Sequence, residues 1–364
     1  MTGSKIAHFG LARQYKNLKA ELLEATDLVL RSGNLMNGSY TAAFETWLAM
    51  RTSTAYALTV HSGTQALEIM ASWIRKTSDE NHDHPPIVRI PNITYVATLN
   101  AFIKAGFVIE LVDTDKNGLM RPETENILSN FTKITCNVGL YGANPHLQTI
   151  TGHHYNDVVD GAQHWLVADN VGAGMAISFD PTKNLNASGN GGAIVTNDLD
   201  LYDFAYSYRS NGKPDHESAG TNSRMSELDC AHLSVRANYI DKWQWRRKEI
   251  RHYYLDELKN IDIRCLSRDH LVHADQKFVI YTDKRDKLKQ YLTDAGIETK
   301  IHYPKALSEL PISKHIYAKP DMLSVSINLT RGLLSLPIYP ELTDSEVEFV
   351  AGKVKEFFTN YKAL

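Results

Sequence analysis

The sequence has few cysteines and no long apolar run. Its three cysteines, Cys136, Cys230 and Cys265, are far apart and odd in number, which excludes a disulfide framework and a paired-cysteine zinc site. No segment approaches the ~20 consecutive apolar residues that a membrane-spanning helix needs. Residues 1–9 lack the apolar stretch of a signal peptide. We therefore expect a cytoplasmic protein with no membrane partner.

An excess of charge of one sign is also missing. The net charge is −3, from 39 basic and 42 acidic residues, so no bulk positive field would attract nucleic acid. The adjacent His153 and His154 have no carboxylate or cysteine at metal-ligand spacing, and we expect no metal site. A basic run at residues 246–251 is either a pyrophosphate site or a solvated helix face.

The first half of the chain alternates short apolar runs with amphipathic ones. The periodicity predicts strands and helices in alternation, at Tyr56–Val60, Gly63–Arg75, Ile87–Ile90, Tyr95–Ala105 and Phe107–Val112, with further short strands between residues 134 and 196. This alternation is typical of an α/β fold with a largely parallel sheet.

The second half has a different pattern. Residues from Met225 to about Leu258 contain no glycine or proline, which predicts a long, mostly helical segment bridging two domains. With 364 residues, we expect roughly two domains, covering residues 1–245 and 246–364. A strand is predicted near Leu323–Asn328. The Thr343–Glu346 segment reads as a capping box that starts the last helix.

One candidate site lies where the first predicted strand meets the first helix. Gly63 allows a tight turn, Thr64 adds a hydroxyl donor, and the helix start offers free backbone N–H groups and a positive dipole end. These features suit a phosphate. The alternative is an ordinary Ser or Thr N-cap.

A second candidate pairs an acid with an amide. Asp160 follows an apolar strand, the position at which open α/β sheets bind ligands. Its carboxylate is suited to hold a proton on a pyridine nitrogen, and Gln163 would reach a phenolic oxygen of the same ring. The alternative is a turn aspartate that caps the next element.

A third candidate is an amine beside a glycine-rich stretch. Lys183 follows a strand and a proline-containing turn, and residues 189–192 allow close approach of backbone to a ligand. A lysine of lowered pKa can form a Schiff base there, unless it is a solvated loop lysine. Tyr95, at a helix start, would stack on a flat ring or pack in the core.

The joint order of these motifs resembles the DegT-type family of pyridoxal-phosphate-dependent nucleotide-sugar aminotransferases. The resemblance runs from about Ala12 to Phe357. Its segments are SGTQAL (62–67), PNITYVAT (91–98), VDTD (112–115), VVDGAQ (158–163), SFDPTKNL (178–185), GNGGAIVT (189–196), GTNSRMSEL (220–228), HYP (302–304) and LSLPIYP (334–340). Nine ordered segments are far more specific than any one of them.

The resemblance implies an aspartate-aminotransferase-like fold (fold type I), with a mainly parallel seven-stranded sheet in the large domain and a smaller C-terminal α+β domain. It implies pyridoxal 5'-phosphate as the cofactor. The family's roles carry over by position. Lys183 would hold the cofactor covalently, Asp160 would contact the pyridine nitrogen, Gln163 would lie near the ring hydroxyl, and Tyr95 would stack on the ring. The phosphate would be bound by Gly63, Thr64 and Ser178, and Asn222 would reach the phosphate of the neighbouring subunit's cofactor.

The reaction implied is transfer of an amino group from an amino acid, L-glutamate by resemblance, to a nucleotide-linked keto sugar. Lys183 and Asp160 would be the catalytic residues of a homodimer with shared active sites. Two alternatives stay open. One is an aminotransferase acting on a non-nucleotide ketone such as a cyclitol, and the other is a non-catalytic member of the family.

Overall fold

The central element of the protein, seen in a computed structural model, is an eight-stranded sheet with the order β1-β7-β6-β5-β4-β2-β3-β10. The structure describes residues 5–79, 85–121, 133–145, 157–216, 218–266, 272–312, 316–317 and 322–362. No helix in these ranges is long and apolar enough to cross a membrane. The expected α/β class with a mainly parallel seven-stranded sheet is confirmed, and the two-residue strand β10 adds an eighth strand at one edge.

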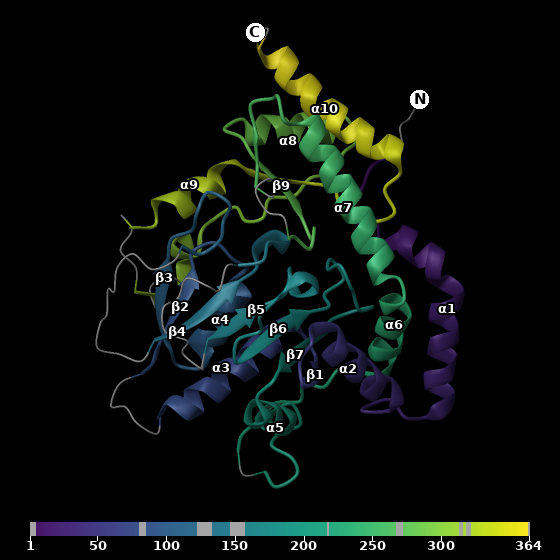
Figure 1. The fold of residues 1–364 in the computed structure, drawn as a ribbon, viewed down its shortest axis with the longest axis vertical. Helices are drawn as coiled ribbons and strands as arrows, with labels where there is room; N and C mark the ends of the chain where they lie inside the picture. The colour runs from purple at the N-terminus through teal and green to yellow at the C-terminus, as the bar shows by residue number, and fades with distance from the viewer. Residues whose placement is uncertain are drawn as a thin grey trace.

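The elements follow one another as the alternating pattern predicts (Figure 1). Up to residue 237 they are α1 (Leu11–Ser32), α2 (Ser39–Thr52), β1 (Tyr56–Val60), α3 (Gly63–Asp79), β2 (Ile87–Pro91), α4 (Val96–Lys104), β3 (Val108–Val112), β4 (Lys133–Val138), β5 (Val158–Asp160), β6 (Gly174–Ser178), β7 (Gly192–Thr196), α5 (Leu199–Tyr208) and α6 (Glu227–Ala237). They continue with α7 (Ile240–Glu257), β8 (Arg264–Cys265), β9 (Phe278–Tyr281), α8 (Arg285–Asp294), β10 (Ile316–Tyr317), α9 (Ser324–Gly332), β11 (Leu333–Leu336) and α10 (Asp344–Lys362).

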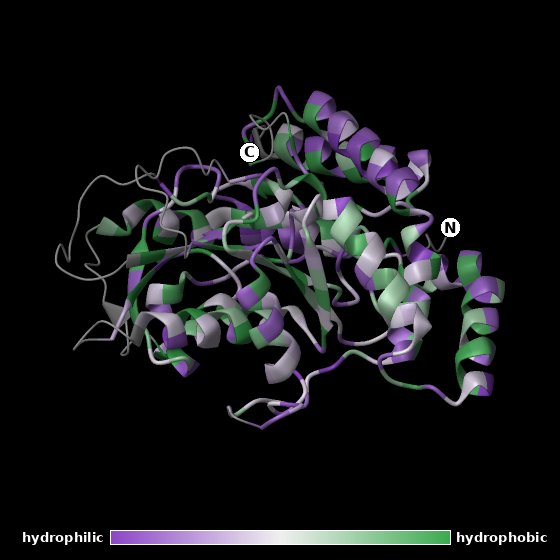
Figure 2. Cartoon of the chain, turned by 60° about the horizontal axis from the view of Figure 1, so that its bottom comes forward, coloured by the Kyte–Doolittle hydropathy of each residue, from purple (hydrophilic) through white to green (hydrophobic). Residues whose placement is uncertain are grey.

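Both faces of the large sheet are covered. One cluster of buried side chains joins the sheet to α3, α4 and α5, and a second joins it to α1, α2 and α6. Every residue of β6 and β7 is buried, as expected for strands covered on two faces. In Figure 2, the strands of the sheet carry green, hydrophobic residues. This double cover leaves the strand ends as the place where a ligand can enter.

A smaller sheet lies beyond the large one, with the antiparallel order β11-β9-β8. Its core includes residues of α7, α8 and α10, and Figure 1 shows these helices grouped around it. The predicted long helix is two helices, α6 and α7, separated at residues 238–239. Residue 245 lies inside α7, which runs from the large sheet to the smaller one (Figure 1).

The prediction of a strand at Leu323–Asn328 is wrong, because this segment begins helix α9. The Asp113 carboxylate, at the end of β3, accepts hydrogen bonds from the backbone N–H groups of Val325 (3.0 Å) and Ser326 (2.8 Å). These amides belong to the first turn of α9, where N–H groups have no partner within the helix. A carboxylate more than 200 residues away thus decides the local structure.

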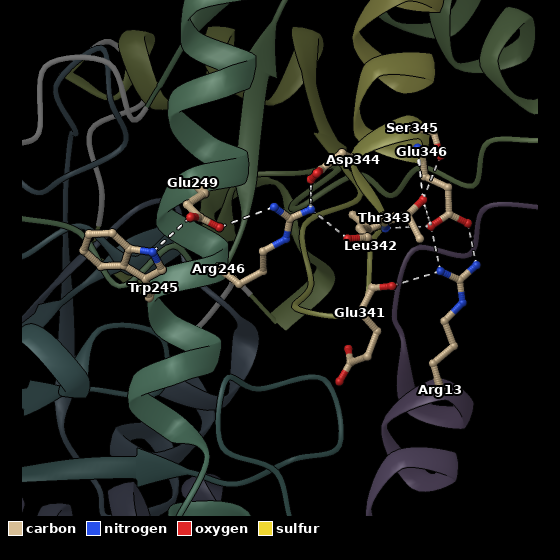
Figure 3. A network of polar contacts seen from close by, with 10 residues as sticks. All are labelled: Arg13, Trp245, Arg246, Glu249, Glu341, Leu342, Thr343, Asp344, Ser345 and Glu346. Carbon is tan, nitrogen blue, oxygen red and sulfur yellow. Dashed lines mark hydrogen bonds and ion pairs between the residues drawn. The ribbon is translucent and has the colours of Figure 1, made fainter.

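The two ends of the chain are joined by a polar network (Figure 3). The Arg13 guanidinium, on α1, donates to both carboxylate oxygens of Glu346 (2.7 and 2.5 Å). The predicted capping box is confirmed: the Thr343 N–H donates to Glu346, and the Glu346 N–H donates to the Thr343 hydroxyl. Arg246, on α7, donates to the Leu342 carbonyl (2.9 Å). Helices α1, α7 and α10 are therefore fixed together.

Replacing Asp113 tests the origin of α9. We expect Asp113→Ala to lower the free energy of unfolding by about 1–2 kcal/mol, because two first-turn N–H groups lose their acceptor. Urea denaturation followed by circular dichroism measures the change. The control is Asp286→Ala, which removes a carboxylate that is 80% exposed and should change stability by less than ~0.5 kcal/mol. Equal stabilities of the two variants would contradict this account of α9.

Candidate active site

The first part of the site is the start of α3. The Ser62 hydroxyl accepts a hydrogen bond from the Gln65 N–H (3.1 Å), so this serine caps the helix. Gly63 packs so closely on β6 that a Cβ there would lie 2.7 Å from the Ser178 Cβ. The glycine thus lets the helix N-terminus, the Thr64 side chain and the Ser178 hydroxyl face one space. The motif can therefore serve both expected functions at once: Ser62 caps the helix, while Thr64 and the helix N-terminus stay available for an anion.

Asp160 ends β5 and points into the same space. It is 6% exposed, and its carboxylate accepts from the Thr98 hydroxyl (2.8 Å) and the Ala162 N–H (3.1 Å). Burial raises the pKa of Asp160, while the bond from Thr98 and the charge of Lys183 act in the opposite direction. A cation in front of this carboxylate would offset its desolvation.

Lys183 lies in the turn after β6, and its backbone N–H donates to the Asp180 carbonyl (2.9 Å). The Asp180 carboxylate in turn accepts from the Thr182 N–H and hydroxyl, which fixes the turn. Burial lowers the pKa of Lys183, and the charges of Asp160 and Asp180 raise it. The amine of Lys183 therefore loses its proton more easily than the amine of an exposed lysine does. A nucleophile or a general base needs such a neutral amine.

Gln163 is held from two sides. Its side-chain oxygen accepts from the Tyr141 backbone N–H (2.7 Å), and its side-chain nitrogen donates to the Tyr303 hydroxyl (3.1 Å). Tyr303 comes from beyond residue 300, so this contact connects the large sheet to the C-terminal part of the chain. The rings of Tyr303 and Tyr95 lie 6.0 Å apart between centroids. Tyr95 itself is 56% exposed, at the mouth of the space.

These groups line one cavity of about 370 Å³, within the size range of small-molecule sites. Seven of the eight residues predicted from the sequence line it: Gly63, Thr64, Tyr95, Asp160, Gln163, Ser178 and Lys183. Asn222 does not. It is exposed and accepts a hydrogen bond from the Arg224 guanidinium (3.3 Å). Its predicted role toward a neighbouring subunit stays a prediction.

Several lining residues were not among the predicted site residues, Lys277 and Thr182 among them, and neither was Thr98, the partner of Asp160. Lys277 directly precedes the buried strand β9, and a lysine in that position is the feature that would have drawn attention to it. Burial and the nearby Lys183 lower the pKa of Lys277 to about 7. His153 and His154 lie outside the described residues. Within the described residues, no cluster of possible metal ligands occurs.

The basic run only partly matches the expectation of a solvated face. Arg247 is buried on α7 and donates to the backbone carbonyls of Asp275 (3.2 Å) and Ile338 (2.7 Å). Arg251 is buried as well, beside the Asp275 carboxylate at 3.4 Å. These arginines hold α7 against the loops around the smaller sheet, whereas Lys248 is exposed and Arg246 partly exposed, so only part of the run is a solvated face.

A family model matches residues 16–355 and is described as the DegT/DnrJ/EryC1/StrS aminotransferase family. The chain belongs to this family. Its members resemble the chain along almost its whole length, and the relatives include nucleotide-sugar aminotransferases, which confirms the enzyme class predicted from the ordered motifs.

Individual relatives define the likeness further. The chain is 32% identical to the erythromycin biosynthesis sensory transduction protein EryC1 of Saccharopolyspora erythraea, covering 95% of this chain and 97% of that one. It is also 32% identical to the dTDP-3-amino-3,6-dideoxy-alpha-D-galactopyranose transaminase of Aneurinibacillus thermoaerophilus, covering 93% and 95%. The solved structure of S. venezuelae DesV in complex with a ketimine intermediate matches with a TM-score of 0.89 at 27% identity, covering 98% and 99%.

The residues present fit pyridoxal phosphate. The buried carboxylate of Asp160 and the amine of Lys183 line the same cavity, and a helix N-terminus with the Ser178 hydroxyl lies at its wall. A Cβ on Gly192 would lie 2.3 Å from the Ser62 carbonyl carbon. Glycine is therefore required for the close approach that builds the anion end of the cavity.

Replacing Thr98 tests the charge state of Asp160. The pKa of Asp160 is raised above its ordinary value of 3.8, so the folded protein binds a proton there more readily than the unfolded chain does. Protonation of Asp160 therefore stabilises the fold at low pH, and this stabilisation is lost as the pH rises through the raised pKa. Thr98→Val removes a hydrogen bond to the charged form. We expect the free energy of unfolding to fall by about 1.5–3 kcal/mol at pH 7.5, and by less at pH 4.5.

Urea denaturation at the two pH values measures this difference. The matched control is Thr330→Val, because the Thr330 hydroxyl is buried and donates to the neutral Ile327 carbonyl (2.8 Å). Its cost should be the same at both pH values. A Thr98→Val cost independent of pH would show that Asp160 does not titrate in this range.

Proposed function

We propose that the protein binds pyridoxal 5'-phosphate on Lys183 and transfers an amino group from an amino acid, L-glutamate, to a nucleotide-linked keto-deoxyhexose. The observation that carries the proposal is the joint placement of the Lys183 amine and the Asp160 carboxylate in one cavity, with a helix N-terminus at its wall. The relatives named as transaminases of dTDP-linked amino sugars support the substrate class.

Asp160 has the task of keeping a proton on the ring nitrogen. Its carboxylate is fixed by Thr98 and Ala162, so it presents a negative charge in a low-dielectric site. When bound, pyridoxal phosphate supplies a ring that withdraws electrons from the carbon that loses its proton. The buried position of Asp160 makes its attraction to a ring N–H stronger than it would be in water.

Lys183 has two tasks in this proposal. Its amine would hold the cofactor covalently, and as a free amine it would act as the general base that takes the proton from the reacting carbon of the donor. A general base works best when its pKa lies near the working pH. The lowered pKa of Lys183 acts in that direction.

The remaining residues hold and orient. The N–H groups at the start of α3, with the Thr64 and Ser178 hydroxyls, suit the phosphate. Tyr95 and Tyr303 face the cavity with rings 36° from parallel, and the Gln163 amide fixes Tyr303. Such positioning can lower the activation barrier by about 7 kcal/mol when the reacting groups are well oriented.

We propose a homodimer in which Asn222 reaches the partner's cofactor. Two features of the described chain support an interface. Asn222 is exposed and outside its own cavity, and α1 carries exposed Leu23, Leu28 and Leu30, each about half exposed or more. Helix α1, at the right of Figure 2, shows apolar and polar residues together. Apolar side chains gathered on one helix are typical of a surface that another chain covers.

The first test replaces the amine. Lys183→Ala should lower turnover at least ~10²–10⁴-fold, the contribution of a positioned acid–base group, with the fold unchanged. Borohydride reduction and peptide mapping of the unmodified protein should place the pyridoxyl mark on the peptide that contains Lys183. The control, Lys242→Ala, removes an exposed lysine of α7 and should behave as wild type. A mark on another lysine would refute the assignment.

The second test concerns the substrate. With L-glutamate as donor, release of 2-oxoglutarate should depend on a nucleotide-linked keto sugar when a panel of such sugars is compared with cyclitol ketones and free keto sugars. Turnover of the cyclitol ketones alone would favour the first alternative. If no ketone reacts although glutamate converts the bound cofactor to its amine form, the acceptor class is wrong while the donor reaction stands.

A further inference from the structure

The cavity contains a second lysine to which the proposed reaction gives no task. Lys277 directly precedes β9 and is 5% exposed. Its backbone N–H donates to the Tyr141 carbonyl (3.0 Å), which fixes the residue beside the loop that holds Gln163. Together with Lys183 and His302, Lys277 lines the cavity. The residue therefore faces the site from the smaller sheet, opposite the strands that carry Asp160 and Ser178.

The Lys277 ammonium has no acceptor. Within the part of the chain that the structure describes, no hydrogen bond or ion pair to its Nζ occurs, and the Nζ lies 5.8 Å from the centroid of the Phe9 ring. Buried charges in proteins are normally paired. The carboxylate of Asp180 attracts Lys277 electrostatically, but it already accepts two hydrogen bonds from Thr182. An almost fully buried cation without a partner, facing a cavity, points to an anionic ligand.

The surroundings of Lys277 indicate which end of the ligand it meets. Besides burial, the positive charges of Lys183 and Arg247 lower the pKa of Lys277. Lys277 and Lys183 in turn both lower the pKa of the buried His302, which lines the cavity as well. No arginine lines the described part of the cavity. Lys277 thus lies near Lys183 and His302, beside the amine that would exchange with the substrate.

We propose that Lys277 is a substrate-binding residue whose ammonium pairs with a carboxylate of the amino donor. This inference rests on the proposed function. An amino acid has its α-carboxylate on the carbon that reacts, so a donor placed beside Lys183 brings a carboxylate next to Lys277. The phosphates of a nucleotide sugar are separated from the reacting carbon by the sugar ring, and they would lie farther toward the mouth.

A lysine suits a site that receives two different substrates in turn. A charged amine pairs with the donor carboxylate, and a neutral amine can donate to or accept from a sugar hydroxyl. A pKa of about 7 makes both forms accessible near neutral pH. An arginine would keep its charge and would remain unpaired and buried when the uncharged sugar ring occupies the site.

The test separates the two half-reactions of the loaded enzyme in single turnovers. In Lys277→Met, the concentration of L-glutamate that gives half the maximal rate should rise about 10- to 100-fold, the range for loss of a charged hydrogen bond. The maximal rate and the half-saturating concentration of keto sugar should change less than about threefold. Lys277→Arg should restore most of the affinity for glutamate.

A binding measurement without turnover complements the kinetics. Maleate, a dicarboxylate that cannot react, is titrated into the loaded enzyme by calorimetry, and its dissociation constant should rise at least about 10-fold in Lys277→Met. The matched control is Lys300→Met, which removes a lysine that lies outside the cavity and pairs with Glu298 at 2.8 Å. This control should bind maleate and glutamate as wild type does.

The outcomes distinguish this inference from the function on which it rests. If wild type does not convert its cofactor with glutamate, the proposed function fails. If wild type reacts and Lys277→Met binds glutamate and maleate equally well, only the assignment of Lys277 is overturned. A variant that loses affinity for the keto sugar alone also overturns it, because the anionic group would then belong to the acceptor. Thermal unfolding of each variant verifies that the fold is kept.

Discussion

The site depends on one constraint: a carboxylate and an amine are both buried in the same cavity, and water can reach neither freely. Desolvation raises the pKa of Asp160 and lowers the pKa of Lys183, so both groups are driven toward their neutral forms. A ligand that carries a ring N–H and a group able to react with an amine relieves both penalties at once. The cavity is therefore predisposed to a cofactor of that chemistry before any substrate arrives.

The large sheet holds these groups rigidly, and the C-terminal part of the chain completes the site. Asp160 and Ser178 end neighbouring parallel strands, β5 and β6, and Lys183 follows in the next turn. From the other side, Tyr303 bonds to Gln163 and Lys277 bonds through its backbone to Tyr141. The cap of α9 by Asp113 connects the same two parts. Contacts among the strand ends of the large sheet build the cofactor end, and contacts with the C-terminal part of the chain complete the cavity.

This division explains what the sequence could predict. Gly63, Asp160 and Lys183 lie at strand ends or in the turns that follow them, so a local pattern and its order identify them. The α9 segment could not be read correctly, because alternation of apolar and polar residues at 323–328 fits a strand, and the carboxylate that caps a helix there, Asp113, is distant in the sequence. Arg247 appeared to be one of a run of solvated cations, yet its carbonyl partners come from residues 275 and 338. Neither partner is visible in a local window.

The same division bears on specificity. The cavity walls of the described chain carry two lysines and two aspartates, Lys183, Lys277, Asp160 and Asp180, and in the proposed reaction these groups would serve steps common to different amino donors and keto sugars. Deep residues of this kind cannot distinguish one hexose from another. The residues that could do so are those at the mouth, where Tyr95 is exposed, and those that a second subunit would bring, since Asn222 is exposed and does not line its own cavity. In the proposed dimer, sugar choice would therefore depend on the surface on which two chains meet, and the chemistry on the interior of each chain.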